Sequence, residues 1–216
     1  METVLAFLRQ LSENNDRDWM AVHKKEYEEA KQVFNVLVDE LIQGICQFDG
    51  TLAGQKARDC VFRLHRDTRF SHDKRPYKTN FGAAMAEGGR KSGNPLYYIH
   101  IEPGKSFVAG GVYMPDADRL AKIRQEIDYN AEGLIQVVGA PGFQEHFGRL
   151  SGESLKRAPK GYPADHPHVE WLKMKSYLVS SPVDDADFRQ ETFTRDLLKR
   201  FRMMYPLKQY LTTAIS

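Results

Sequence analysis

The chain has 216 residues, of which 41% are hydrophobic and 28% are charged, and its formal net charge is +2. These proportions exclude a disordered or fibrous protein, and so small a charge argues against a dedicated DNA-binding domain. The two cysteines, Cys46 and Cys60, lack CxxC spacing and are too few for a disulfide framework, so we expect free thiols, no structural zinc and no cofactor.

The first predicted elements are helices. Apolar residues at Val4, Leu5, Leu8 and Leu11 indicate a short amphipathic helix. A longer single helix is predicted over about 16–45, because apolar residues recur there at steps of three and four. Its apolar positions are Trp19, His23, Tyr27, Ala30, Phe34, Leu37, Leu41 and Ile45.

Strands are predicted next. In the first of them, 60–66, Phe62 and Leu64 alternate with Arg63 and His65. A turn at Glu102–Lys105 joins two further strands into an antiparallel hairpin. The predicted strands are 60–66, 79–85, 96–101, 106–113 and 174–179.

The second half of the chain returns to helices. Pro115 and Asp116 indicate a helix start, and Leu120, Ile123 and Ile127 supply its apolar face. Residues 139–164 are rich in glycine and proline and are expected to be irregular, and a helix over 188–204 is expected to end before Pro206.

This order of elements predicts an α+β fold. Helices, a mostly antiparallel sheet and helices again favour a single domain over 1–216, with a core of about 3–212 and helices packed on one face of the sheet. No stretch approaches the roughly 20 apolar residues that cross a bilayer. The run Val4–Leu8 is too short for a signal-peptide core, so we expect a cytoplasmic protein that does not associate with membranes.

Positive charge is concentrated at residues 63–78. This segment holds six cationic and two acidic residues, a balance of +4, so the rest of the chain carries −2. Arginine forks onto phosphate and carboxylate oxygens, and lysine adds a mobile charge, so the segment predicts a site for a small anionic ligand. The candidate ligand-binding residues are Arg63, Arg66, Arg69, Lys74, Tyr77, Lys78 and Tyr98.

Three residues are candidates for catalysis, although the sequence does not settle whether the protein is an enzyme. His65 and His100 could transfer protons near neutral pH, and Asp67 could orient an arginine or a histidine. Tyr98 and His100 occupy alternate positions of one predicted strand and therefore share a face, as Arg63 and His65 do in another. One sheet face could thus carry all four side chains. The alternative is that the charges pair with acidic residues and form a solvated edge.

Two further functions are compatible with the same segment. It could bind nucleic acid, with Phe70, Tyr77 and Tyr98 as stacking groups, although the small net charge argues against this. It could instead bind an acidic protein partner, which nothing in the sequence identifies. His65-Arg66-Asp67 lacks the other kinase motifs, and the zinc-protease and serine-hydrolase motifs are absent from the sequence, so no catalytic metal is expected.

Motifs along nearly the whole chain resemble a known family. They include Arg66-Asp-x-Arg-Phe-Ser-x-Asp-Lys-x-Pro-Tyr-Lys78, Tyr98-x-His100-x-Glu-Pro-Gly104, Gly110-Gly-x-Tyr113 and Leu155-Lys-Arg-x-Pro-Lys-Gly161. They are similar to motifs of the bacterial conserved-hypothetical proteins of domain-of-unknown-function family 2461, from about residue 3 to 212. The resemblance implies a stand-alone cytoplasmic domain and implies no particular activity.

Overall fold

The structure is a computed structural model that describes residues 1–70 and 72–216. Its strands form one antiparallel sheet in the order β1-β2-β3-β4, which confirms the predicted fold class. The register places Ile99 opposite Ala83 on one side and Val108 on the other. The strands are β1 (Phe81–Ala86), β2 (Leu96–Ile101), β3 (Ser106–Val112) and β4 (Tyr177–Val183).

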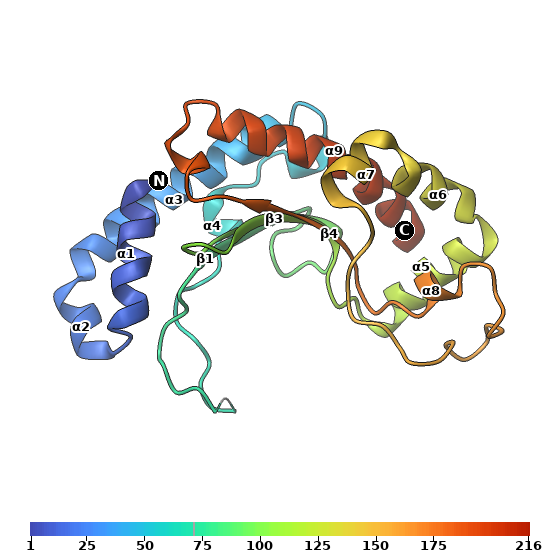
Figure 1. The fold of residues 1–216 in the computed structure, drawn as a ribbon, viewed down its shortest axis with the longest axis horizontal. Coiled ribbons are helices and arrows are strands. Elements are labelled where there is room, and N and C mark those ends of the chain that lie inside the picture. The colour runs from blue at the N-terminus through green and yellow to red at the C-terminus, as the bar shows by residue number, and fades with distance from the viewer. Residues whose placement is uncertain (71) are drawn as a thin grey trace.

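Helices surround the sheet on one face and at both ends. Figure 1 shows α3 and α9 lying over the same face of the arched sheet, with α1 and α2 at one end and α5 to α8 at the other. The predicted packing of helices on one face is therefore confirmed. The helices are α1 (Glu2–Glu13), α2 (Arg17–Val22), α3 (Lys24–Ile45), α4 (Ala57–Cys60), α5 (Ala117–Tyr129), α6 (Ala131–Gly139), α7 (Pro141–Phe147), α8 (Val169–Leu172) and α9 (Phe193–Ile215).

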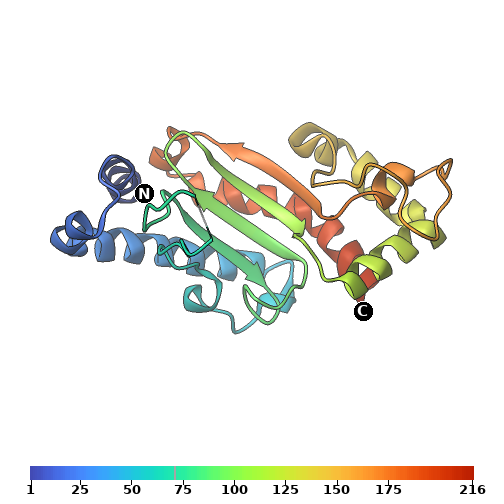
Figure 2. The ribbon, with the colours of Figure 1, turned by 90° about the horizontal axis from the view of Figure 1, so that it is seen from below.

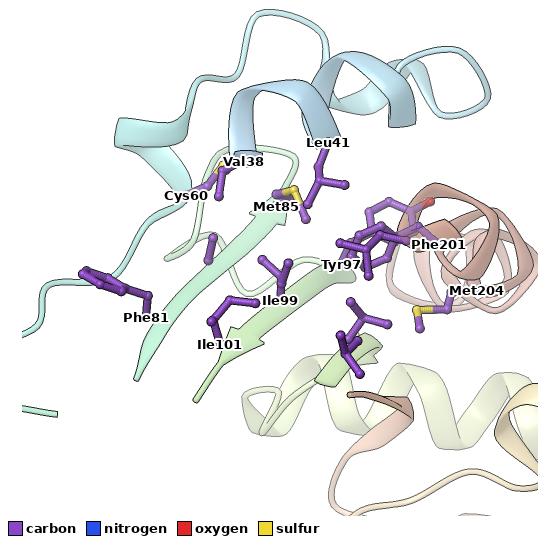
Figure 3. Packing of buried hydrophobic residues seen from close by; sticks show 14 of the residues in the cluster. Val38, Leu41, Cys60, Phe81, Met85, Tyr97, Ile99, Ile101, Phe201 and Met204 are labelled. Carbon is purple, nitrogen blue, oxygen red and sulfur yellow. The ribbon is translucent and has the colours of Figure 1, made fainter. Parts of the chain in front are cut away.

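The core lies between the sheet and the two long helices. Leu41 of α3 points toward Met85 of β1, and Phe201 of α9 lies beside Tyr97 of β2 (Figure 3). Burying side chains of this size stabilises the fold by about 1.5–3 kcal/mol each. Because successive strand residues face opposite sides, burial of Tyr97 in the core places Tyr98 on the other face of the sheet.

That other face carries small residues and is not covered by α3 or α9. Figure 2 shows it from below, with the strands in front of both helices. The strand register on this face places Tyr98 of β2 between Ala84 of β1 and Ala109 of β3. Two short side chains beside a large one leave space above the sheet.

Two helix boundaries differ from the sequence prediction. The helix predicted over 16–45 is interrupted at His23, whose ring stacks on Trp19 at 4.1 Å and whose Nδ1 lies 2.9 Å from the Trp19 carbonyl oxygen. Pro206 does not end α9, which continues to Ile215. Pro206 has no N–H to donate within the helix, but it lies on the exposed side of α9, and buried Met204 and Leu207 on either side of it hold the helix on the core.

The strand predicted over 60–66 does not form. Within 60–66 only Val61 bridges to the sheet, at Ala83, and the chain then leaves it to form a protruding segment, described over residues 63–70 and 72–78, which we call the arm. At the base of the arm His65 bridges to Tyr77, whose backbone N–H and carbonyl both bond to the Asn15 side chain at 3.0 Å. Ser71, part of the family motif, lies outside the described residues.

Residues 141–147 form α7 and not irregular structure, because Pro141 begins a helix whose Phe143 is buried. Both cysteines are free, as expected. Throughout 1–70 and 72–216, every helix is too short or too polar to traverse a lipid bilayer.

Candidate functional site

Most of the arginines in the arm are paired with its own two aspartates. Arg66 and Arg75 both contact Asp73, at 2.6 and 2.7 Å, and Arg69 contacts Asp67 at 2.6 Å. The bonds from Arg75 and Arg66 hold the pKa of Asp73 far below its usual value, and the bond from Arg69 lowers that of Asp67. Two of the predicted ligand-binding arginines, Arg66 and Arg69, therefore already have carboxylate partners, as does their neighbour Arg75.

Three other predicted residues have local roles in the arm. The Lys74 ammonium donates to the Thr68 carbonyl at 3.1 Å. Tyr77 is buried and meets the ring of His65 edge-on, with 4.9 Å between centroids. His100 instead stacks on Phe107 of the sheet, so the two predicted catalytic histidines occupy different surroundings.

A hollow of about 510 Å³ lies on the sheet face opposite α3 and α9. Ala84, Ala109 and Tyr98 lie on its floor, and the walls come from Phe62 and Lys78 on either side of the base of the arm, the loop after β1 and the ends of β3 and β4. Most of the lining is apolar, which suits the body of a small organic molecule. The lining residues are Phe62, Lys78, Ala84, Ala86, Arg90, Ser92, Gly93, Asn94, Leu96, Tyr98, Phe107, Ala109, Tyr113 and Leu178.

Two cations face this hollow. The Lys78 ammonium lies 5.5 Å from the centroid of the Phe62 ring, and burial, together with the charge of nearby Arg63, lowers its pKa. Arg90 donates to the backbone carbonyls of residues 58 and 59, at 3.0 and 2.8 Å. Among the described residues neither Lys78 nor Arg90 forms an ion pair with a carboxylate.

A hydrogen-bonded chain runs along the same face from Tyr98 to Glu102. The Tyr98 hydroxyl lies 3.1 Å from Nδ1 of His100, and Nε2 of His100 lies 3.2 Å from Oε2 of Glu102. Thr79 donates to the other carboxylate oxygen at 2.9 Å. The three residues alternate along and just beyond β2, which places their side chains on one face.

The partners of His100 determine its protonation. A carboxylate only accepts, so Nε2 carries the proton donated to Glu102, and Nδ1 accepts from the Tyr98 hydroxyl and from the Asn80 amide, 3.3 Å away. Burial lowers the pKa of His100 despite the opposing effect of Glu102, which keeps the ring neutral at pH 7. Burial also raises the pKa of Tyr98 to about 12.

Gly82 leaves space for the hydrogen-bonded residues Tyr98, His100 and Glu102. A Cβ atom on Gly82 would lie 2.5 Å from the Tyr98 hydroxyl oxygen, so any other residue would displace the ring. Sequence reasoning missed Gly82, Arg90 and Glu102 as parts of the site. The two-residue spacing of Tyr98, His100 and Glu102 is a signal that could have identified Glu102, whereas Arg90 lies in a glycine-rich loop with no such pattern.

The structure thus separates the ten predicted site residues into groups. Lys78 and Tyr98 meet at the hollow, with His100 beside Tyr98 and the charge of Arg63 close to Lys78. The remaining six lie within the arm: His65, Arg66, Asp67, Arg69, Lys74 and Tyr77.

Within the part of the chain that the structure describes, no three His, Cys, Asp or Glu side chains are grouped so as to hold a metal ion. No curated protein and no solved structure matches the chain. The sequence matches the family described as conserved hypothetical protein (DUF2461) over residues 3–210, a span that contains the arm, the hollow and the Tyr98–Glu102 chain. On this match over nearly its whole length, the protein belongs to the DUF2461 family.

Proposed function

We propose that the protein binds a small organic anion, with its apolar body in the hollow and its carboxylate or phosphate against Lys78 and Arg90. One observation carries the proposal: a mostly apolar cavity of about 510 Å³ adjoins two cations that have no carboxylate partner among the described residues. Ligand sites in proteins are typically cavities of roughly 300–1,000 Å³ with a few polar groups that orient the ligand.

The state of Lys78 supports an anion as the ligand. Its ammonium is partly buried and close to Arg63, and both effects lower its pKa, so the charged form is destabilised in the unliganded protein. A carboxylate or phosphate placed there would remove this penalty and form charge-assisted hydrogen bonds. The proposal therefore places the anion where the arm rejoins the sheet.

The paired arginines have a supporting role in this proposal. Arg66 and Arg69 are held by Asp73 and Asp67, so an anion would have to compete with a carboxylate already in contact. These pairs stiffen the arm, and Asn15 fixes its base through two bonds to the backbone of Tyr77.

Thermal-shift measurements with matched probes test the proposal. Phenylacetate and phenyl phosphate combine an aromatic body with an anion, toluene has the body alone, and inorganic phosphate has the charge alone. A ligand at a hundredfold excess over Kd adds about 2.7 kcal/mol to the free energy of unfolding, or roughly 5 to 10 °C in Tm for a chain of this size. We expect such a shift with phenylacetate or phenyl phosphate, and a smaller one with toluene or inorganic phosphate.

Three variants locate the site. Lys78→Met removes a cation of the hollow, Ala109→Leu fills the space beside Tyr98, and Arg69→Met removes an arginine of the arm that is 77% exposed. Lys78→Met and Ala109→Leu should abolish the shift, and Arg69→Met should leave it unchanged. Loss of the shift in Arg69→Met alone would place the anion on the arm, and no shift with any aryl anion would refute the proposal.

A second candidate function is the docking of an acidic protein partner on the tip of the arm. Phe70 is 95% exposed there, and the guanidinium of Arg69 lies 5.8 Å from the centroid of its ring. An exposed aromatic residue beside arginine is the composition of interface hot spots. A charge-reversed Arg69→Glu/Phe70→Ala variant that captures the same proteins from a native lysate as the unmodified chain would argue against it.

A further inference from the structure

We infer that Tyr98 is a nucleophile and that the protein transfers or hydrolyses the acyl group of a small ester or thioester bound in the hollow. The inference rests on the proposed function for the position of the substrate, and it assigns to the same site a reaction class. Its basis is the hydrogen-bonded chain Tyr98–His100–Glu102, in which the hydroxyl of Tyr98, a residue that lines the hollow, is joined to a neutral imidazole and the imidazole to a carboxylate. Nucleophile, base and orienting acid in hydrogen-bond contact are the elements of a catalytic triad.

The direction of the hydrogen bonds favours a nucleophile over a general acid. Nε2 of His100 donates to Glu102, so Nδ1 is an acceptor and the Tyr98 proton points toward it. The remaining lone pairs of the hydroxyl oxygen are then available to an electrophile in the hollow. A general acid would need the opposite orientation, with its proton directed at the ligand.

The surroundings of His100 keep its ring neutral and therefore able to accept a proton. Phe107 stacks on its ring with 4.7 Å between centroids, Asn80 approaches Nδ1, and the charge of Lys78 opposes its protonation. Glu102 acts in the other direction and would stabilise the imidazolium that forms when Tyr98 loses its proton. Thr79 holds the Glu102 carboxylate in place from the opposite side.

The reaction proceeds in two steps. In the first, a bond forms between the Tyr98 oxygen and the carbonyl carbon, the hydroxyl proton passes to Nδ1 of His100, and the leaving alcohol or thiol takes that proton as its bond to the carbonyl breaks. In the second, a water molecule attacks the acyl-tyrosine and gives a proton to His100, which returns it to the tyrosine oxygen as the acid departs.

Arylsulfonyl fluorides test the nucleophile without knowledge of the substrate. Attack by Tyr98 forms an O–S bond and breaks the S–F bond, so fluoride leaves and the proton passes to His100. Peptide mass spectrometry of the full chain treated with benzenesulfonyl fluoride measures labelling at each tyrosine. Tyr113 and Tyr129 are 68% and 89% exposed and serve as internal references.

We expect labelling of Tyr98 at least about tenfold faster than of either reference, because an adjacent base typically contributes roughly 10²–10⁴-fold. His100→Asn should remove this advantage and leave the references unchanged, and Glu102→Gln should reduce it and shift its pH midpoint. The rate at Tyr98 should fall on acidification as His100 becomes protonated. A Tyr98 rate equal to the references, or one unaffected by both variants, would overturn the inference.

A second probe separates this inference from the proposed function. 4-(Fluorosulfonyl)benzoate carries the carboxylate that Lys78 and Arg90 would bind, so it should label Tyr98 faster than the neutral probe, and Lys78→Met should remove the difference. Equal rates for both probes would count against anion recognition and leave the nucleophile standing. Circular dichroism of each variant checks the fold, and Glu102→Gln provides the decisive comparison if His100→Asn does not fold.

Discussion

Replacement of Lys208 by methionine removes one half of a buried ion pair. The Lys208 ammonium lies 2.9 Å from Oδ2 of Asp49, and their side chains are only 4% and 1% exposed. Tyr97 donates to the same carboxylate oxygen at 3.0 Å, and the Thr51 hydroxyl donates to the other at 2.6 Å. Methionine keeps most of the volume and the helix propensity of lysine in α9, so the principal change is the loss of a charge.

An unpaired charge at such a site is costly. Breaking a buried pair typically lowers the free energy of unfolding by about 3–5 kcal/mol. Because Tyr97 and Thr51 still bond to the carboxylate, we expect about 3 kcal/mol for Lys208→Met. In the double variant Asp49→Asn/Lys208→Met the site is neutral and the amide oxygen still accepts, so we expect it to be at least about 1 kcal/mol more stable than Lys208→Met alone.

The pH dependence of this effect has a definite sign. Burial raises the pKa of Asp49, but bonds from Thr51 and Lys208 more than offset it and lower the net pKa. The pair therefore contributes stability that is present above the ordinary pKa of about 3.9 and is lost as pH falls through the lowered value. Without Lys208 the carboxyl takes up a proton more easily, so the deficit of the variant should shrink on acidification.

Urea denaturation followed by tryptophan fluorescence measures these differences. Lys199→Met is the matched control, because Lys199 lies on the same helix, pairs with Asp196 at 2.8 Å and is 63% exposed. It should change the free energy of unfolding by less than about 0.5 kcal/mol. A Lys208→Met protein within about 1 kcal/mol of the unmodified chain, or a double variant no more stable than the single one, would refute the reasoning.

Gly82→Ala places a Cβ atom 2.5 Å from the Tyr98 hydroxyl oxygen and should therefore displace the ring from His100. We expect it to slow labelling of Tyr98 by benzenesulfonyl fluoride at least about tenfold. Gly139→Ala, which has open space around it, should leave the labelling rate unchanged. The buried Cys60 thiol has a pKa raised to about 11, chiefly by burial, and should react with a disulfide reagent only when urea unfolds the chain; rapid reaction in the native protein would contradict this. Burial lowers the pKa of His100, so the unfolded chain binds a proton there more readily, and stability should fall as pH drops below about 6.5. His100→Gln should flatten this part of a stability–pH curve, and an unchanged curve would show that another group is responsible.

The sheet was predictable where its signals are local. The turn at Glu102–Lys105 and the alternation on both sides of it define the hairpin of β2 and β3, and the structure has both. The apolar spacing of Phe34, Leu37 and Leu41 similarly reflects the buried side of α3. In these segments residues close in the sequence determine which side chains face the core.

Prediction failed where distant contacts outweigh local preference. Pro206 is a helix-breaking residue, yet α9 continues because Met204 and Leu207 pack on the core on either side of it. Residues 60–66 alternate as a strand does, but after Val61 the partner of the segment is the returning half of the arm and not the sheet. The alternation of apolar and polar residues does not indicate which segment a strand will pair with.

The hollow could not be predicted because it depends on register. Ala84 and Ala109 are unremarkable strand residues in the sequence, and they leave space only because the register places Tyr98 between them. Arg90 reaches the same space from a loop whose path no pattern in the sequence specifies.

Charge density along the sequence was a partial guide to the site for a related reason. The arm carries its own acidic partners: Asp67 contacts Arg69 and Asp73 contacts Arg66, so two of its six positive charges are balanced within the arm. Lys78 differs because it lies where the arm rejoins the sheet, beyond the reach of those carboxylates and against the apolar ring of Phe62. Its surroundings in space, and not the number of charges around it in the sequence, make Lys78 the stronger candidate for the anion contact that we propose.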